Sequence, residues 1–329
     1  MAKRITILDV AAEAGVSRQT VTRAINGMGD ISEATRERVL QASQRLGYRP
    51  SRFARNLVDR NKTHAVGLVV ASFVNPYFTD IAGDMAAGAM DRGWQLIMAP
   101  GDADRPTVLD LLSRQVDVIV GHFGDDDEAL IAESNNTPII KLEDKAHTRG
   151  VHAVQIDIEA GIRIAVDELA ARGARRFGMV DSGYTRRGGN AYEPSPRRTY
   201  FENSVGSRLS AVVVGDETIS GGGAAFLQLM ESHPDTDAVI MFNDLMALGA
   251  VQTAQARGLD VPSGVRIMGI DGLALGEAVN PQLTSIALDR HALATNALEI
   301  AETIAADDFA PREPINILLE PRILWRDSA

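Results

Sequence analysis

Residues 7–25 read ILDVAAEAGVSRQTVTRAI, and this stretch decides the first part of the fold. Its apolar spacing predicts two short helices, with Gly15 permitting a tight turn and Ser17 able to cap the second helix. The small side chain of Ala11 lets the two helices approach, and Val21 packs the second helix inward. These features predict a helix-turn-helix unit.

The second predicted helix, residues 18–25, separates apolar from polar side chains. Val21, Ala24 and Ile25 fall on one face, at positions i, i+3 and i+4. The opposite face carries side chains that could read bases in a DNA groove: Arg18, Gln19, Thr22 and Arg23. Arginine can pair with guanine, and glutamine with adenine, through two hydrogen bonds each. This face is therefore a candidate for DNA recognition.

A third helix is predicted after Ser32, a residue type that suits an N-cap. Val39, Ala42 and Leu46 continue a helical stripe, and Gly47 suits the C-terminal end of the helix. Three short helices with a small shared core predict an all-α helix-turn-helix domain over residues 1–50.

The charge of the chain is divided unevenly. Residues 1–62 contain 12 Lys and Arg against 6 Asp and Glu, whereas the remaining residues contain 21 against 38. The basic N-terminal part can neutralise phosphates, while the acidic remainder discourages non-specific coating of DNA. This division favours a DNA-binding head joined to a body with a different task.

The N-terminal part contains ordered motifs: ITILDVA at 5–11, AGVS at 14–17, TVTR at 20–23, LGYRP at 46–50 and ARNL at 54–57. Together they resemble the LacI/GalR (lactose-repressor/galactose-repressor) family of bacterial transcriptional regulators. By position, the resemblance implies base-reading roles for Arg18, Gln19 and Arg23. It also implies phosphate contacts, which position a protein on DNA without specifying the sequence, for Thr6, Ser17, Thr22, Asn26, Ser32 and Thr35.

Residues 51–62 form a short polar and basic linker, which is too short for a stable isolated helix. The resemblance implies a hinge helix that becomes ordered when two chains meet on DNA. Ala54 and Leu57 would then lie in the minor groove, with Leu57 acting as a wedge that kinks the duplex. The spacing alone also fits an ordinary linker leucine.

From residue 65 onward, apolar runs alternate with helical stretches. Each run is typical of a buried parallel strand, and the runs lie at 65–71, 96–98, 116–120, 138–140, 177–180, 238–241 and 267–270. The alternation predicts an α/β body of βαβ units with doubly wound parallel sheets. In such folds ligands bind at the carboxyl ends of the strands.

The body contains further motifs: VGLVV at 66–70, NPYF at 75–78, NDLMALGA at 243–250, IMGIDG at 267–272 and EPRIL at 320–324. These resemble the two-lobed, periplasmic-binding-protein-like sensor of the same family. The resemblance implies a ligand-sensing domain over 63–329. Its two lobes would comprise 63–156 with 288–316, and 157–287 with 317–329.

The resemblance also implies an effector cleft between the lobes. Arg, Asn and Asp side chains that converge on a cleft suit vicinal hydroxyls or a polar ring, and aromatic side chains can stack on an apolar face. By position, the effector-binding residues are Tyr77, Phe78, Arg197, Asn243 and Asp271. Asp102, His122 and Glu143 follow predicted strands and extend this set. Taken singly, Asn243 also suits a helix cap and Phe78 a core position.

Two features depart from the family pattern. The stretch between Phe201 and Gly215 is several residues shorter than usual, and Glu217 lies near a position where many members have an aromatic pocket residue. An acidic residue there disfavours phosphorylated ligands. The run Gly221-Gly222-Gly223 opens a predicted helix, which suits either an anion site or plain loop punctuation.

Several protein classes are disfavoured by what the sequence lacks. There are no cysteines, which agrees with a cytoplasmic location, and the N-terminus has no signal-peptide pattern. No apolar run reaches the length of a membrane span. A Walker-type loop, a G-x-G-x-x-G after the first strand and an H-E-x-x-H motif are missing. We therefore expect no enzyme, metal site or cofactor.

The sequence thus predicts a sequence-specific regulator, namely a repressor whose operator affinity changes with a sugar or related polyol. The expected partners are near-palindromic double-stranded operator DNA, the small-molecule effector and a second copy of the chain in a homodimer. One alternative is a corepressor-dependent regulator that senses a nucleobase or another metabolite. A solute-binding protein would share the body but lack the basic head, and a nucleotide-using enzyme would need the missing loop.

Overall fold

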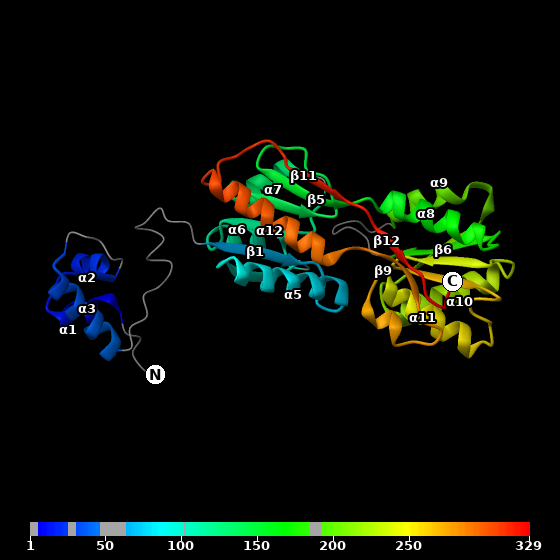
Figure 1. Ribbon diagram of the computed structural model, residues 1–329, viewed down its shortest axis with the longest axis horizontal. Helices are drawn as coiled ribbons and strands as arrows, with labels where there is room; N and C mark the ends of the chain where they lie inside the picture. The colour runs from blue at the N-terminus through cyan, green and yellow to red at the C-terminus, as the bar shows by residue number, and fades with distance from the viewer. Residues whose placement is uncertain (1–5, 26–30, 47–63, 102, 125, 184–191) are drawn as a thin grey trace. The chain divides into compact units, whose positions relative to one another are not determined.

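The computed structural model describes residues 6–25, 31–46, 64–101, 103–124, 126–183 and 192–329. The chain divides into two compact units, Met1–Thr63 and His64–Ala329, which Figure 1 traces by colour. The predicted hinge at 51–62 lies outside the described residues. So do four predicted site residues, namely Asn26, Ala54, Leu57 and Asp102. Among the described residues, no helix is long and apolar enough to cross a membrane.

In its described part, the first unit holds the three predicted helices, α1 (Ile7–Ala14), α2 (Arg18–Ile25) and α3 (Glu33–Leu46). Gly15 ends α1 in the left-handed conformation with a φ of 65°, which glycine adopts without steric cost. The helices share a small apolar core made of Val10, Ala11, Ala14, Val21, Ala24, Val39 and Ala42. The predicted helix-turn-helix geometry is therefore present.

The described part of the second unit contains two six-stranded sheets, one in each lobe. The strands of lobe one are β1 (Ala65–Val70), β2 (Gln95–Pro100), β3 (Val118–Gly121), β4 (Ile139–Leu142), β5 (Val151–Ile156) and β11 (Asn316–Leu319). Their order is β11-β5-β4-β3-β1-β2, and all their pairings are parallel.

Helices cover both faces of this sheet because its strands alternate apolar side chains between the two faces. Val66 and Leu68 belong to the cluster with α5 (Pro76–Asp91) and α12 (Arg290–Ala306). Val69 belongs to the cluster with α6 (Arg105–Ser113) and α7 (Asp127–Glu133). Lobe one is thus a three-layer α/β/α unit.

Lobe two repeats the arrangement, with one antiparallel edge strand. Its strands are β6 (Phe177–Ser182), β7 (Leu209–Gly215), β8 (Ala238–Met241), β9 (Arg266–Asp271), β10 (Thr284–Ala287) and β12 (Arg322–Leu324). They follow the order β12-β10-β9-β8-β6-β7, and β12 runs antiparallel to β10. In Figure 1, α8 (Ile158–Ala171) and α9 (Pro196–Val205) lie on one side of this sheet, opposite α10 (Ile219–Ser232) and α11 (Asp244–Ala256). The stretch after Phe201 is short because a single 3₁₀ turn, Gly206–Arg208, connects α9 directly to β7.

The glycine run in α10 serves helix packing. A Cβ on Gly222 would overlap the backbone of Met246 in α11, and a Cβ on Gly249 of α11 would overlap the carbonyl of Ile219 in α10. The two helices therefore approach to backbone contact, which only residues without side chains permit. This packing explains why glycines occur at 221–223. The sequence alone had suited either an anion site or a loop there.

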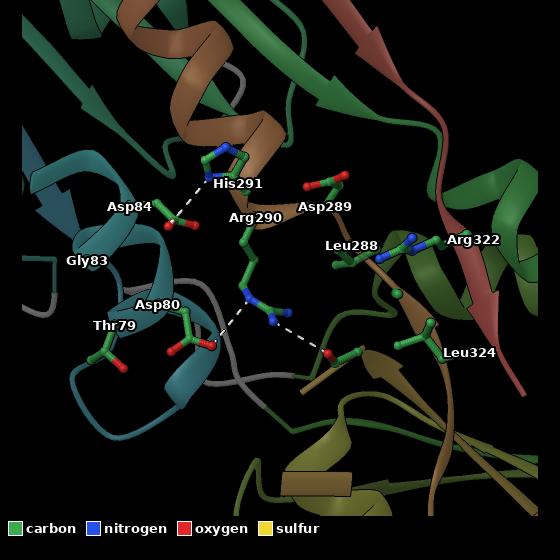
Figure 2. A pocket seen from close by; sticks show the side chains of 12 residues that line it. Thr79, Asp80, Gly83, Asp84, Leu288, Asp289, Arg290, His291, Arg322 and Leu324 are labelled. Atoms are coloured by element: carbon green, nitrogen blue, oxygen red, sulfur yellow. Dashed lines mark hydrogen bonds and ion pairs between the residues drawn. The ribbon is translucent and has the colours of Figure 1, made fainter. Parts of the chain in front are cut away.

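In the described residues, the chain passes between the lobes three times: after β5, after β10 and between β11 and β12. Figure 2 shows Leu288 and Asp289 on the second of these segments, next to Arg322 and Leu324 of β12. The third crossing lies between Leu319 and Arg322, and not at 316/317 as the family resemblance implied. The reason is that β11 pairs with β5 over Asn316–Leu319.

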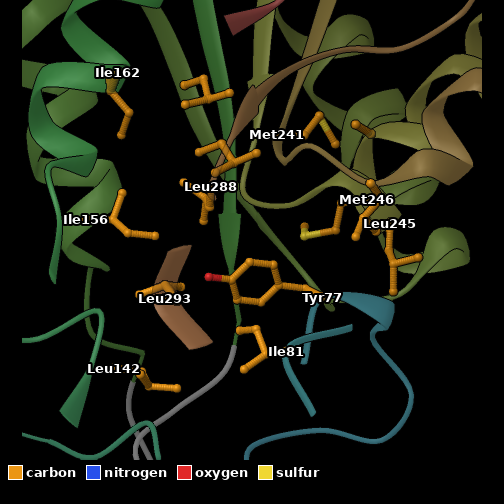
Figure 3. Close-up of a cluster of buried hydrophobic side chains, with 14 of the residues drawn as sticks. Tyr77, Ile81, Leu142, Ile156, Ile162, Met241, Leu245, Met246, Leu288 and Leu293 are labelled. Carbon is orange, nitrogen blue, oxygen red and sulfur yellow. The ribbon is translucent and has the colours of Figure 1, made fainter. Parts of the chain in front are cut away.

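An apolar layer continues from one lobe into the other beneath the crossings. In lobe one it includes Tyr77 and Leu142, in lobe two Met241 and Met246, and Leu288 lies on the segment between them. Figure 3 shows these side chains in one cluster. The junction between the two lobes is therefore stabilised by buried apolar side chains.

The close contact of α10 and α11 predicts a large penalty for Gly249→Ala. We expect about 3 kcal/mol of destabilisation because the new methyl group forces the helices apart. Gly83 in α5 is the matched control, since a Cβ there meets nothing within 4 Å. Gly83→Ala should instead stabilise by about 0.5–1 kcal/mol through helix propensity. Urea unfolding of both variants measures this, and equal stabilities would contradict the close contact.

Candidate functional site

The predicted base-reading face of α2 points away from the core of the first unit. Arg18 and Gln19 are exposed and Arg23 is half-buried, while Val21 and Ala24 are buried. Ser17 begins the helix, and its Oγ accepts a hydrogen bond from the N–H of Thr20 at 3.1 Å. The long polar side chains at the start of α2 are therefore free to enter a groove.

The residues predicted to contact phosphates mark the beginnings of the described helices. Thr6 precedes α1 and donates its N–H to Asp9 Oδ2 at 2.8 Å. Ser32 precedes α3 and accepts from the N–H of Thr35 at 3.3 Å. Helix N-termini attract anions, so this placement suits contacts with phosphates. Thr22 differs because it lies within α2 and its hydroxyl donates to the Arg18 carbonyl at 3.1 Å.

A cleft of about 1390 Å³ lies between the two lobes of the second unit. Its lining includes all the predicted effector residues that the structure describes: Tyr77, Phe78, His122, Glu143, Arg197, Asn243 and Asp271. They lie at or just beyond the carboxyl ends of strands or at the starts of helices. The topology of parallel sheets gathers these ends at one edge. The structure therefore brings together residues that are as far apart in sequence as 77 and 271.

The wall from lobe one is built around Glu143. Its Oε1 accepts a hydrogen bond from the Tyr77 hydroxyl at 2.5 Å and lies 2.9 Å from His122 Nε2. The rings of Phe78 and His122 pack edge to face with centroids 5.0 Å apart. Arg197 approaches from lobe two, with 3.8 Å between its Nη2 and Glu143 Oε2. The carboxylate thus links the two walls.

A buried lysine holds the loop that carries Glu143. The Lys141 ammonium is fully buried, 3.1 Å from Asp127 Oδ1 and 2.9 Å from Asp144 Oδ2. It also donates to the carbonyl of Lys145 at 2.7 Å. Glu143 itself has a φ of 64°, which is unfavourable for an L-residue. The contacts of the buried Lys141 ammonium therefore help to hold this turn in place.

The surroundings of Glu143 keep it ionised. Burial of its carboxyl acts to raise the pKa of Glu143, but the hydrogen bond to His122 and the charge interaction with His122 lower this pKa. With the contributions of Arg197 and Tyr77, the pKa of Glu143 falls from 4.5 to about 2. Burial and the neighbouring Glu143 raise the pKa of Tyr77 well above 10. At neutral pH the wall therefore presents a carboxylate and a neutral phenol.

The wall from lobe two carries a cation over an aromatic ring. The Arg197 guanidinium lies 4.6 Å from the centroid of Phe242 and donates to the Phe242 carbonyl at 2.5 Å. Asn243 caps α11 by accepting the N–H of Met246 at 2.9 Å. Its buried Nδ2 has no hydrogen-bond partner among the described residues. Asn243 is therefore both the helix cap that the sequence allowed and an unsatisfied donor lining the cleft.

Asp271, at the end of β9, is the second unsatisfied group. Its φ is 133°, its side chain is buried, and its Oδ2 has no hydrogen-bond partner among the described residues. Burial raises the pKa of Asp271 well above its usual range, and the charge of Asp244 adds to this. Leaving a buried polar atom unpaired costs about 1–3 kcal/mol. A ligand that pairs with these atoms recovers that free energy.

Several residues that line the cleft were not predicted from the sequence. Phe242 directly precedes the predicted Asn243, and Asn75 lies two residues before the predicted Tyr77. The rule that ligands bind at strand ends would have included Phe242. Arg105 and Glu133 form a bidentate ion pair at 2.8 and 2.9 Å that no local pattern announces. Glu217 was noted for its position, and it lines the cleft with its Oε1 accepting from Ser182 Oγ at 2.5 Å.

Together, the described parts form a helix-turn-helix unit followed by a two-lobed sensor whose cleft is lined by polar and aromatic side chains. This combination defines the class of ligand-binding regulators of transcription. Two family models match the chain: bacterial regulatory proteins of the lacI family over residues 6–51, and the periplasmic binding protein-like domain over 166–329.

Similarity to known proteins extends over most of the chain. Catabolite control protein A of Priestia megaterium is 32% identical over 289 residues, covering 86% of this chain and 87% of that protein. The structure of the transcriptional regulator CelR–cellobiose complex is 28% identical with a TM-score of 0.69, covering 99% and 100% of the two chains. The Lac repressor dimer bound to operator and an anti-inducer shares the fold, with 23% identity, a TM-score of 0.78 and 99% coverage of both chains.

The chain therefore belongs to the lacI family of bacterial regulatory proteins. It is a DNA-binding transcriptional regulator and not an enzyme. The predicted family and fold class, a helical head and a two-lobed α/β body, are confirmed.

The low pKa of Glu143 predicts a specific dependence of stability on pH. Its folded-state pKa lies below the unfolded value, so ionised Glu143 stabilises the fold above pH 4.5 and this contribution is lost as the pH falls to about 2. The shift corresponds to about 3 kcal/mol at most. We expect Glu143→Gln to unfold at lower urea concentration than the wild type at pH 7, and the gap to narrow towards pH 3. An unchanged gap would contradict the assignment.

Proposed function

We propose that the protein is a repressor that binds near-palindromic operator DNA as a homodimer and responds to a neutral sugar in the cleft. The observation that carries the proposal is the pair of unsatisfied buried atoms, Asn243 Nδ2 and Asp271 Oδ2, beside Arg197. A sugar hydroxyl both donates and accepts hydrogen bonds, so adjacent hydroxyls can pair with donors and acceptors together.

The remaining lining supports a sugar over other small molecules. Tyr77, Phe78, Phe123 and Phe242 supply flat apolar surface beside the polar groups, and a pyranose ring has both kinds of face. Among the described lining residues, acidic side chains outnumber basic ones. This excess, to which Glu217 contributes, opposes phosphorylated sugars. The similarity to the CelR–cellobiose complex further supports a sugar.

The proposed role in DNA binding rests on α2. Arg18 and Gln19 are exposed at its start, the end that reads bases in helix-turn-helix proteins. Ser17 and Ser32 stand at helix N-termini, where phosphates bind favourably. The similar fold of the Lac repressor dimer on its operator supports this arrangement.

The proposed homodimer would cover an apolar surface on the sensor. Strand β2 ends its sheet, and Met98 on this strand is 52% exposed. Phe73 before α5 and Leu111 on α6 are exposed as well. Exposed edge strands and apolar patches favour association. A second copy related by a two-fold axis would place two DNA-binding heads opposite two half-sites.

The proposed response to the effector is a change in the angle between the lobes. A ligand that contacts Glu143 on one wall and Asp271 on the other stabilises one separation of the walls over the others. Coupling of about 1–3 kcal/mol would change operator affinity by about 5- to 150-fold.

The cleft assignment predicts a hit in a thermal-unfolding screen of glucose, cellobiose, lactose, sugar phosphates, polyols, nucleosides and nucleobases. A ligand at 100 times its Kd stabilises by about 2.7 kcal/mol, which raises Tm by a few degrees. Arg197→Ala should weaken binding at least about 10-fold, because it removes charged hydrogen bonds.

The matched control for this screen is Arg198→Ala. Arg198 is the next residue of α9, but it pairs with Glu202 at 2.8 Å and does not line the cleft. A hit that survives Arg197→Ala would place the ligand elsewhere. A sugar phosphate as the strongest hit would overturn the proposed neutral sugar.

The α2 assignment predicts that Arg18→Ala costs about 1–3 kcal/mol of operator affinity and relaxes preference at one base pair. The operator would first be selected from a random DNA library and then measured by fluorescence anisotropy. Arg38→Ala, an exposed arginine on α3, is the control for charge. A uniform loss of affinity across all sequences would make Arg18 a phosphate contact.

A further inference from the structure

Arg290 stands where the second crossing segment enters lobe one. It is the first residue of α12, and Asp289 caps this helix by accepting the N–H of Ala292 at 2.9 Å. The Arg290 side chain is only 18% exposed. It lies among the residues of a second, smaller pocket between α5, the crossing segment and β12, drawn in Figure 2.

The guanidinium of Arg290 contacts both lobes. In lobe two, its Nη1 donates to the carbonyl of Asp271 at 2.7 Å and its Nη2 to the carbonyl of Gly272 at 3.4 Å. In lobe one, its Nε lies 3.4 Å from Asp80 Oδ2 on α5, an ion pair that Figure 2 marks. The centroid of the Tyr77 ring, also on α5, is 5.9 Å away.

The contact with Asp271 is the stronger of the two. Asp80 is half-exposed, and solvent-exposed ion pairs contribute little. A charged donor bound to a sheltered carbonyl contributes more. Arg290 therefore belongs to α12 of lobe one, but its side chain is bound mainly to the backbone of lobe two.

The turn that Arg290 holds is strained. Asp271 has a φ of 133° and Gly272 a φ of 73°, and a Cβ on Gly272 would overlap Ala287. Lobe two fixes the amides of this turn: Gly272 N–H donates to Ser285 Oγ at 3.0 Å and Leu273 N–H to Asp244 Oδ2 at 2.6 Å. Arg290 fixes the carbonyls from the other side. The backbone of Asp271 is thus oriented by both lobes.

We infer that Arg290 is a positioning residue for effector binding, which holds the Asp271 side chain towards the cleft and ties it to α5. The inference rests on the proposed function of the cleft. Asp271 and Tyr77 lie on opposite walls, and one guanidinium reaches the strand end that carries the first and the helix that carries the second. Movement of one lobe against the other must stretch or break this link.

The same pocket supplies a matched control. Arg322 also lines it, but the exposed side chain of Arg322 makes no hydrogen bond or ion pair within the described residues. Arg322→Met removes the same charge from the same pocket without touching the turn. Arg290→Lys keeps the charge, but a single ammonium cannot reach Asp80 and both carbonyls together.

The first test is hydrogen exchange of the full chain without any ligand, read on peptides that cover residues 268–276. Arg290→Met should speed exchange of the Gly272 and Leu273 amides, Arg290→Lys should have a smaller effect, and Arg322→Met should have none. Exchange equal to the wild type in Arg290→Met would overturn the inference. This readout is independent of whether the cleft binds a sugar.

The second test is a double-mutant cycle on effector affinity, with cellobiose as the probe or, if cellobiose does not bind, the panel sugar that does. In the otherwise wild-type chain, Arg290→Met should weaken binding of the probe sugar about 10-fold. In an Asp271→Asn background the same change should cost less than about twofold, because the residue acts through Asp271. Additive losses would make Arg290 a general structural residue. If no panel sugar binds the wild type, the proposed function fails while the exchange result still decides the role of Arg290.

Discussion

The rest of the sensor depends on one constraint, which is that two sheets of mainly parallel strands present the carboxyl ends of those strands to each other. Backbone groups and short side chains collect at these ends because the chain turns there from strand to helix. In the described residues, three crossings hold the two edges face to face above a shared apolar layer. The cleft is therefore a consequence of topology, and its chemistry depends on which side chains occupy the strand ends.

Those side chains divide into a satisfied and an unsatisfied group. Glu143 is fully engaged by Tyr77 and His122 and stays ionised, so the wall of lobe one is pre-organised. Asn243 and Asp271 on the other wall each keep one buried atom that has no hydrogen-bond partner in the part of the chain that the structure describes. An unpaired buried atom costs free energy that a ligand can recover. An effector can therefore gain free energy by pairing with the unsatisfied atoms of lobe two. Lobe one supplies a rigid wall against which the cleft can close around that effector.

Local sequence patterns could predict much of this arrangement, but not all of it. Gly15, Ser17 and the apolar spacing of α2 place the helix-turn-helix because every requirement lies within twenty residues. Apolar runs predicted seven of the strands equally well, whereas β5, β7, β10, β11 and β12 were not identified individually. The family resemblance supplied the cleft residues. The strained turn at Asp271, the buried Lys141 and the link through Arg290 each depend on partners that are distant in the sequence. Asp127 pairs with Lys141, and Arg290 binds the Asp271 carbonyl from the opposite lobe, which no local pattern encodes.

The central claim is that occupation of the cleft changes the affinity of the head for DNA. The most direct measurement is a titration of labelled operator with the full chain at fixed salt, with and without a saturating cleft sugar. The account predicts a change in Kd of about 5- to 150-fold, matched by an equal change in sugar affinity when operator is bound, because coupling is reciprocal. A sugar that binds the cleft while leaving the operator Kd unchanged would contradict it.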